Sequence, residues 1–217
     1  MNKYIFTLSV LTGLSISSMA LTAPSYAHDL RYRSAPVSYN LVSAERDVEA
    51  ARSMIEDMGD KAISFLADTS LSQKQKEEKF RIMLNQNFDM ETIGRFALGR
   101  NWKTASADQR KEYQKLFKDL VVNVYSSRFK EYEGQKFEVT SARETGKKDV
   151  TVSSLIVPDS GPKIKVDWRV RNRNGSYKII DVIIEGVSMT LTQRSDFSSV
   201  IQRGGGDIEV LLDHLKK

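Results

Sequence analysis

A run of aliphatic residues from Ile179 to Ile184 limits the folds open to this chain more than any other stretch. It opens the segment SYKIIDVIIEGVSMTLTQRSDF, residues 176–197. Side chains in a β-strand alternate between two faces, so both faces of this run are apolar apart from Asp181. A strand in a sheet with one hydrated face shows a cleaner alternation. We therefore expect this strand to be covered on both faces, either by protein or by a bound apolar molecule.

Three further segments have the two-residue period of β-strands, at 137–140, 150–157 and 164–170. The last of these alternates apolar with charged residues, which predicts one apolar and one charged face. Turn-forming residues separate the strands, at Pro158 to Pro162 and at Asn174-Gly175. Strands separated by such short turns predict a four-stranded antiparallel sheet.

Helical periodicity dominates the chain on both sides of these strands. The predicted helices cover about 43–68, 72–88, 89–99, 106–132, 194–202 and 207–217. Gly59 is a possible bend or break in the first helix. Ser72, Asp89 and Ser106 are suited to cap helix N-termini. The order of elements, N-terminal helices, four strands and two C-terminal helices, predicts an α+β fold in which helices lie on one face of a curved four-stranded antiparallel sheet.

The N-terminal residues have the composition of a secretory signal peptide. A positive charge at Lys3 precedes an uncharged stretch to Leu21, and Ser25-Tyr26-Ala27 places small residues at a cleavage site. A retained membrane anchor is the alternative interpretation. We expect cleavage near Ala27, a flexible leader at 28–42 and one folded domain at 43–217. No later segment approaches about 20 apolar residues, so we expect an exported, soluble protein.

Residue types that carry catalysis or bind metals are sparse. The chain has two histidines and no cysteine, and no group of residues resembles a zinc site. Neither a G-x-S-x-G motif nor a phosphate-binding loop is present. The sequence therefore predicts no catalytic residue, no cofactor and no metal site. Asp181 is the exception that needs a reason, because a carboxylate on an apolar strand is costly unless it is paired. An ion pair, with a base on the long helix or with Arg194, is one interpretation, and a general acid or base of raised pKa is the other.

Basic and acidic residues are interspersed, with a formal net charge of +5. An exported chain rarely meets nucleic acid, so we expect no nucleic-acid partner. One predicted hairpin carries a cluster of four cations: Arg169, Arg171, Arg173 and Lys178. This hairpin is either solvated surface or a docking patch for anionic lipid headgroups or acidic partners.

Two blocks of the sequence resemble one protein family. They are FDMETIGRFALGRNWKTASADQRKEYQKLF at residues 88–117 and DVIIEGVSMTLTQRSDF at residues 181–197. With the helical C-terminus, they are similar to the MlaC or toluene-tolerance family of periplasmic phospholipid-binding proteins of Gram-negative bacteria. The resemblance extends from about Val48 to Lys217, and the signal peptide agrees with it.

The resemblance implies a soluble periplasmic carrier, which we expect to be a monomer, that binds one glycerophospholipid by its acyl chains. It also implies two partners, an outer-membrane lipoprotein–porin complex and an inner-membrane ABC transporter with an MCE-domain subunit. Moving phospholipid between them would maintain outer-membrane lipid asymmetry. Burial of each CH₂ group is worth about 0.8 kcal/mol, so such a carrier needs a dry cavity between sheet and helices.

Candidate cavity residues come from the apolar faces of the strands and of the long helix. They are Val121, Tyr125, Val152, Val166, Trp168, Ile180, Val182 and Ile184, with Phe96, Leu98 and Trp102 as candidates to close one end. Two other functions stay open. One is a small isomerase- or hydratase-like enzyme with Asp181 or Asp167 as a buried base, and the other is a chaperone for acylated proteins.

Overall fold

The computed structural model describes residues 38–146 and 148–217, with residues 38–44 described by their backbone alone. The predicted signal peptide lies outside these residues. The helices are α1 (Ser38–Ala67), α2 (Gln73–Asn87), α3 (Met90–Leu98), α4 (Asn101–Thr104), α5 (Ala107–Ser126), α6 (Met189–Arg203) and α7 (Ile208–Leu215). A 3-10 helix, η1 (Ser127–Glu131), continues α5. The strands are β1 (Lys136–Thr145), β2 (Asp149–Val157), β3 (Ile164–Arg173), β4 (Ser176–Ile184) and β5 (Val187–Ser188). None of the helices in the described ranges is long and apolar enough to cross a membrane.

The strands form one antiparallel sheet in the order β1-β2-β3-β4-β5. This confirms the predicted α+β class and antiparallel pairing, with five strands in place of four. The additional strand is β5, whose two residues pair with the end of β4. The Asn174-Gly175 turn is also confirmed, because both residues have positive φ angles, 55° and 86°, as a tight β-hairpin turn requires.

Local capping chemistry fixes where three of the helices begin. Ser72 and Ser106 each accept a hydrogen bond from a backbone N–H of the first turn, and each forms a complete capping box with a glutamine. Asp89 caps α3 by accepting from the N–H of Thr92 at 2.9 Å. These three predicted starts are therefore confirmed.

The helix does not break at Gly59, because α1 runs through this residue as one helix. A Cβ atom at Gly59 would lie 2.2 Å from Cδ1 of Phe137 on β1. The absence of a side chain at Gly59 therefore allows α1 to pack closely against β1.

The predicted start of the sixth helix, near Arg194, is also wrong. α6 begins at Met189, with Ser188 as its N-cap accepting from the N–H of Leu191 at 3.1 Å. Thr190 and Thr192 in the first turn are poor helix formers, which concealed the start. The short helix α4 was not predicted.

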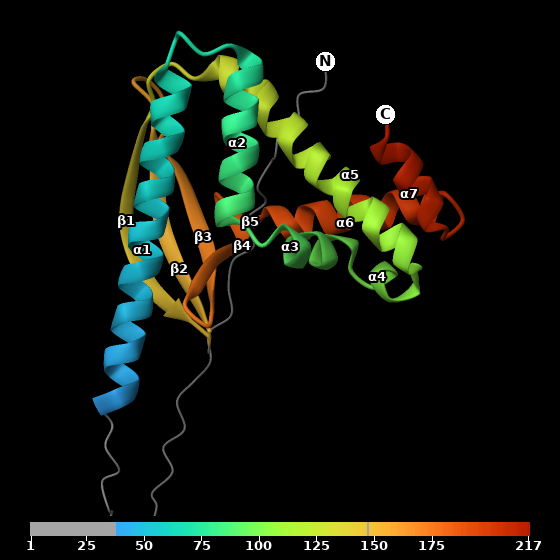
Figure 1. Ribbon diagram of the computed structural model, residues 1–217, viewed down its shortest axis with the longest axis horizontal. Helices are drawn as coiled ribbons and strands as arrows, with labels where there is room; N and C mark the ends of the chain where they lie inside the picture. Colours follow the sequence, from blue (N-terminus) through green and yellow to red (C-terminus); the bar gives the residue numbers. More distant parts are fainter. Residues whose placement is uncertain (1–37, 147) are drawn as a thin grey trace, which may run out of the picture. The chain divides into compact units, whose positions relative to one another are not determined.

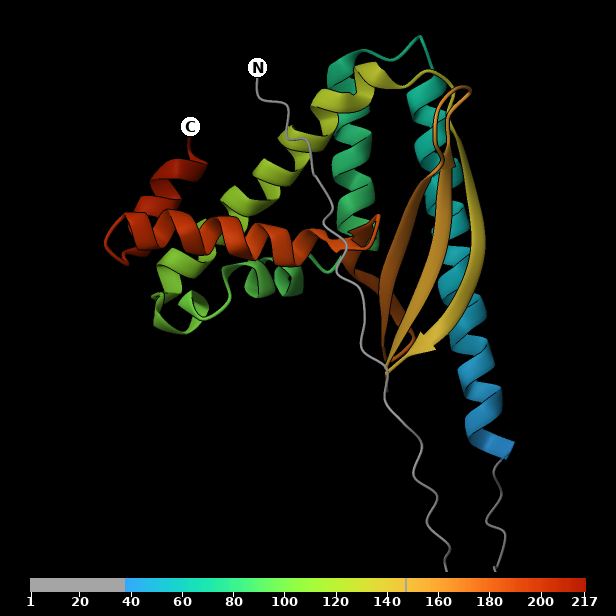
Figure 2. The same ribbon diagram turned by 180° about the vertical axis from the view of Figure 1, so that it is seen from behind.

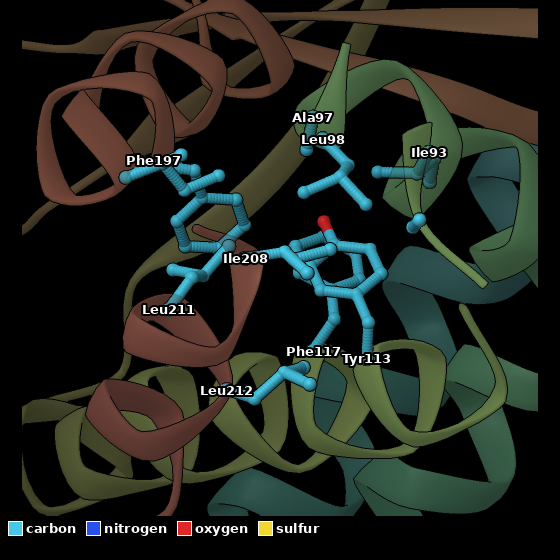
Figure 3. Packing of buried hydrophobic residues seen from close by; sticks show 11 residues of the cluster. Ile93, Ala97, Leu98, Tyr113, Phe117, Phe197, Ile208, Leu211 and Leu212 are labelled. Carbon is cyan, nitrogen blue, oxygen red and sulfur yellow. The ribbon is translucent and has the colours of Figure 1, made fainter. Parts of the chain in front are cut away.

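Buried apolar residues form two separate clusters. The helical core joins α3, α5, α6 and α7, and Figure 3 shows Tyr113 and Phe117 at its centre with Phe197 against them. The Tyr113 and Phe117 rings stack at 5.7 Å, and Phe197 meets both edge-on. The hydroxyl of Tyr113 donates to the carbonyl of Gly94 at 2.9 Å, and burial raises its pKa. This core is therefore filled by side chains.

The second cluster, the sheet core, lies between α1 and one face of the sheet (Figure 1). It consists of Ala51, Ile55, Met58, Val150, Val152, Val170 and Ile179. Figure 2 shows the sheet from its other face, with α1 behind it. Phe88, at the end of α2, packs against both cores and forms a bridge to Ile179 of β4. The two cores therefore meet at β4.

Candidate functional site

The strand predicted to be covered on both faces is covered along only part of its length. Ile179 and Ile180 are buried, whereas Val182, Ile183 and Ile184 remain half-buried. β4 contacts α2, α3 and α6 in addition to α1. The prediction is thus confirmed at the start of the aliphatic run, and the end of β4 is left with accessible apolar surface.

The inner face of the sheet continues this surface onto β2 and β3. Trp168 lies directly opposite Val152 on one side and Val182 on the other, and Val166 lies opposite Ile184. Val152 and Val166 are buried, while Trp168, Val182 and Ile184 are half-buried. The sheet therefore brings five of the predicted cavity residues together on one face. Ile180 is buried beside them, at a bulge in the pairing of β3 with β4.

The polar end of Trp168 is satisfied inside the sheet. Its Nε1 donates to the hydroxyl of Ser154 at 2.9 Å, which in turn donates to the carbonyl of Val166 at 3.1 Å. Phe137 meets the Trp168 ring edge-on at 6.2 Å. These contacts fix the indole and leave the rest of its ring for apolar contact.

On the helical side, the apolar stripe of α5 extends beyond the helical core. Tyr113 and Phe117 are buried in that core, and Val121 is half-buried. One turn further on, Val124 and Tyr125 are 47% and 38% exposed. Here α5 approaches the sheet end of the molecule, and its last turn lies beside the start of α2, where Gln73 Nε2 donates to the carbonyl of Ser126 at 2.7 Å (Figures 1 and 2). The second half of α5 therefore presents apolar side chains that the helical core does not cover.

The environment of Tyr125 shows what kind of surface this is. Desolvation by the surrounding protein raises the pKa of its hydroxyl, although the side chain is partly accessible to water. Tyr125 therefore belongs to an apolar surface at this end of α5 that is partly covered by protein and partly accessible.

The three residues predicted to close one end of a cavity are separated from these two surfaces. Leu98 is completely buried in the helical core, and Trp102 packs against that core from α4. Phe96 is 53% exposed on the outer side of α3. Whether the other apolar faces enclose a cavity stays a prediction.

Two open hollows occur elsewhere on the surface. One, of about 510 Å³, lies where α1, α2 and η1 meet, and includes Leu66, Lys76 and Phe129 in its lining. The other, of about 950 Å³, lies where strands meet turns around Asp149, Arg169 and Arg171. Neither is lined by a predicted cavity residue, and both have polar as well as apolar walls.

The predicted docking cations are engaged with partners of the same chain. Asp149 is buried and accepts hydrogen bonds from Arg171 at 2.6 and 2.9 Å and from Arg169 at 2.8 Å. Desolvation opposes its ionisation, but the hydrogen bonds and charges of Arg171 and Arg169 outweigh this effect and lower its pKa. Arg173 pairs with Asp89 at 3.1 Å, and Lys178 donates to the carbonyl of Gln86.

Asp181 does not form the predicted ion pair. Its carboxylate accepts hydrogen bonds from Ser188 Oγ at 2.6 Å, from Thr190 Oγ1 at 2.7 Å, and from the N–H groups of Thr190 and Val182. Arg194 instead packs on Gly99, where a Cβ atom would lie 2.5 Å from its Nε. Asp181 therefore ties β4 to the first turn of α6, whose free N–H groups favour a negative charge.

The other carboxylate considered as a base, Asp167, is also engaged. It accepts from Ser153 Oγ at 2.5 Å and lies 3.3 Å from Lys165 Nζ. Within residues 38–146 and 148–217, no group of three or more His, Cys, Asp and Glu side chains is placed to hold a metal ion.

Comparisons with known proteins identify a family model and curated relatives that this chain matches. A family model described as MlaC protein matches residues 56–217. The chain is 24% identical over 162 residues to the intermembrane phospholipid transport system binding protein MlaC of Haemophilus influenzae, covering 71% of this chain and 76% of that protein. It is 25% identical over 111 residues to the toluene tolerance protein ttg2D of Pseudomonas putida, covering 51% of this chain and 52% of that protein.

A solved structure shares the fold. It is that of a phospholipid-binding protein from Ralstonia solanacearum in complex with a phospholipid. The TM-score is 0.67 at 23% sequence identity, covering 76% of this chain and 94% of that one.

Proposed function

Because this chain belongs to the MlaC family, we propose that it is a carrier that binds a glycerophospholipid by its acyl chains and moves it between membranes. The observation that carries the proposal is the exposed apolar surface of Val124 and Tyr125 on α5, which follows the last residue of the stripe that packs against the helical core, Val121. The phospholipid bound to the Ralstonia solanacearum protein of similar fold supports it.

The physical reason for such a surface is the cost of exposing acyl chains to water. Each CH₂ group that leaves water contributes about 0.8 kcal/mol, so two long chains outweigh any single contact of the headgroup. We propose that the tails lie between the α5 stripe and the half-buried sheet residues Trp168, Val182 and Ile184. Val152, Val166 and Ile180 are buried next to these lining residues in the same sheet.

Transport of this kind breaks no covalent bond and requires no catalytic group. The headgroup stays at the surface, where water solvates it, so we expect little headgroup selectivity. The enzyme alternative is not favoured, because Asp181 and Asp167 both accept hydrogen bonds from neighbouring hydroxyl groups.

The route we propose runs through the periplasm, with cleavage of a signal peptide near Ala27. The N-terminal sequence supports export, and the name of the Haemophilus influenzae relative refers to intermembrane transport. On this basis the donor and acceptor are an outer-membrane lipoprotein–porin complex and an inner-membrane MCE-domain ABC transporter, and the result is outer-membrane lipid asymmetry. Docking through Arg169, Arg171, Arg173 and Lys178 stays a prediction.

Detergent-free purification followed by native mass spectrometry tests the proposal. We expect one bound phospholipid per protein molecule. The Tyr125→Asp variant should lose this bound phospholipid, because the substitution places a negative charge in the acyl-chain site. Val210→Asp is the matched control, since Val210 is equally exposed on α7 and lies outside the proposed site. An empty protein with a carboxylate titrating near neutral pH would favour the enzyme. A captured acylated protein would favour the chaperone.

A further inference from the structure

Phe96 is a large apolar side chain on a helix whose other apolar residues face inward. Ile93, Ala97 and Leu98 are buried in the helical core, whereas Phe96 is 53% exposed on the outer side of α3. A single exposed apolar residue needs no explanation by itself. The residues around this one are what give it significance.

The stretch RFALGRNWKTA, residues 95–105, contains three cations and no carboxylate. Arg95, Arg100 and Lys103 are exposed, and none of them lies within ion-pair distance of a described carboxylate. The hairpin cations Arg169, Arg171 and Arg173 differ, because each is paired with an aspartate. The charge of this stretch is therefore available to a partner outside the chain.

Two more arginines extend the positive charge over the same surface. Arg194 of α6 packs on Gly99 and has no carboxylate partner among the described residues. Arg110 lies 5.4 Å from the centre of the Trp102 ring, and donates hydrogen bonds to the carbonyls of Trp102 and Lys103. α3 and α4 lie along one edge of the helical core, with α6 beside α3 (Figure 1).

We propose that this surface, formed by Arg95, Phe96, Arg100, Lys103 and Arg194, binds the surface of a bilayer that contains anionic phospholipid. Unpaired arginine and lysine side chains are attracted to anionic headgroups, and a protruding phenylalanine suits the boundary between headgroups and acyl chains. Arginine and lysine side chains that have no fixed partner in the protein can follow anionic headgroups, which move within the bilayer. The surface is separate from the acyl-chain site and adds direct membrane contact to a carrier that could otherwise work through protein partners alone.

Co-sedimentation with phosphatidylcholine vesicles, with and without phosphatidylglycerol, tests this proposal at low salt. We expect binding only to the anionic vesicles, and release by high salt because the charges are screened. The triple variant R95Q/R100Q/K103Q should lower the partition coefficient by roughly 100-fold, given the contribution of each cation near an anionic surface. Phe96→Ser should lower it by about tenfold through the lost apolar contact.

The matched control is K61Q/K74Q/K79Q, which removes three exposed cations from α1 and α2. It should bind like the natural protein, and so should Ile82→Ser, which removes an exposed apolar side chain from α2. All variants should keep the co-purified phospholipid and the natural thermal unfolding, which separates this proposal from the carrier proposal. Equal binding to both kinds of vesicle, equal loss in the control triple, or binding to an acidic protein alone would overturn it.

Discussion

The helical core and the sheet core differ in how completely their apolar side chains are covered. The helical core is filled from all sides by α3, α5, α6 and α7 around Tyr113. The sheet core has α1 on one side and strands on the other, and its residues become half-buried towards Trp168, Val182 and Ile184. α5 belongs to the filled core as far as Val121 and leaves it in its last turns, where Val124 and Tyr125 are exposed. The difference shows that apolar side chains remain exposed where α5 extends beyond the helical core.

Polar contacts hold the two cores together where apolar packing ends. Asp181 joins β4 to α6, and Arg173 joins the β3–β4 hairpin to Asp89 at the start of α3. The N–H of Asp89 donates to the carbonyl of Ile179 at 2.9 Å. These contacts join α3 and α6 to the sheet, and Phe88 packs against both cores beside them.

The largest effect we expect separates two tyrosines of the same helix. Tyr113→Ala should lower the free energy of unfolding by about 3–5 kcal/mol, because it empties the centre of the helical core. Tyr125→Ala should lower it by less than about 1 kcal/mol in the lipid-free protein, because no packed core depends on that ring. Urea unfolding of both delipidated variants measures the difference. Equal losses would contradict the contrast between the buried Tyr113 and the exposed Tyr125.

A smaller effect is expected where the two cores are joined. Asp181→Asn should destabilise the protein by about 1–3 kcal/mol, because the amide group cannot accept from all the donors that surround the carboxylate. The start of α6 should become more open, which amide hydrogen exchange near Thr190 would detect. Arg194→Gln is the control and should leave that exchange unchanged. An equal effect of Arg194→Gln would contradict the assignment of the start of α6 to the hydrogen bonds of Asp181.

The approach of α1 to β1 can be tested with one methyl group. Alanine is favoured over glycine inside a helix, yet Gly59→Ala should destabilise by about 1 kcal/mol because the added Cβ collides with Phe137. Replacing Phe137 with leucine in the same chain should recover part of the loss. If the Gly59→Ala single variant is more stable than the natural protein, α1 and β1 can move apart at little cost, and the proposed collision with Phe137 is wrong.

The smallest effect we expect concerns acid. The pKa of Asp149 is lower in the folded state than its ordinary value of 3.8, so its contribution to stability is present above that value. It is lost as the pH falls through the lowered folded pKa. Unfolding measured across this acid range should show a shallower loss of stability for Asp149→Asn than for the natural protein. Identical slopes would show that the ion pairs with Arg169 and Arg171 contribute nothing.

Sequence reasoning succeeded where structure depends on neighbouring residues. The caps at Ser72, Asp89 and Ser106 and the Asn174-Gly175 turn follow from local chemistry. It failed at α6, because Ser188 and Thr190 form its start together with a carboxylate from another element. Asp181 lies only seven positions before Ser188, but the contact depends on the turn between β4 and β5.

The candidate site was predicted in part for the same reason. Strand alternation selected Val152, Val166, Trp168, Val182 and Ile184 from the apolar faces of separate strands, and the pairing of the strands places them on one face. Helical periodicity identified an apolar stripe on α5 but could not show which half of it other helices would cover. For the same reason, the sequence prediction grouped two residues of α3 that differ in burial: Leu98 is completely buried, and Phe96 is exposed. Periodicity gives the direction of a side chain, and tertiary contacts decide what that side chain meets.

The central claim is that acyl chains lie between the second half of α5 and the inner face of the sheet. A phospholipid with a photoreactive group in its acyl chain, loaded into the delipidated protein and irradiated, tests it most directly. The account predicts crosslinked peptides from residues 121–125 and from β3 and β4 around Trp168 and Val182. Crosslinks confined to the outer side of α1 or to α7, with none on α5, would contradict it.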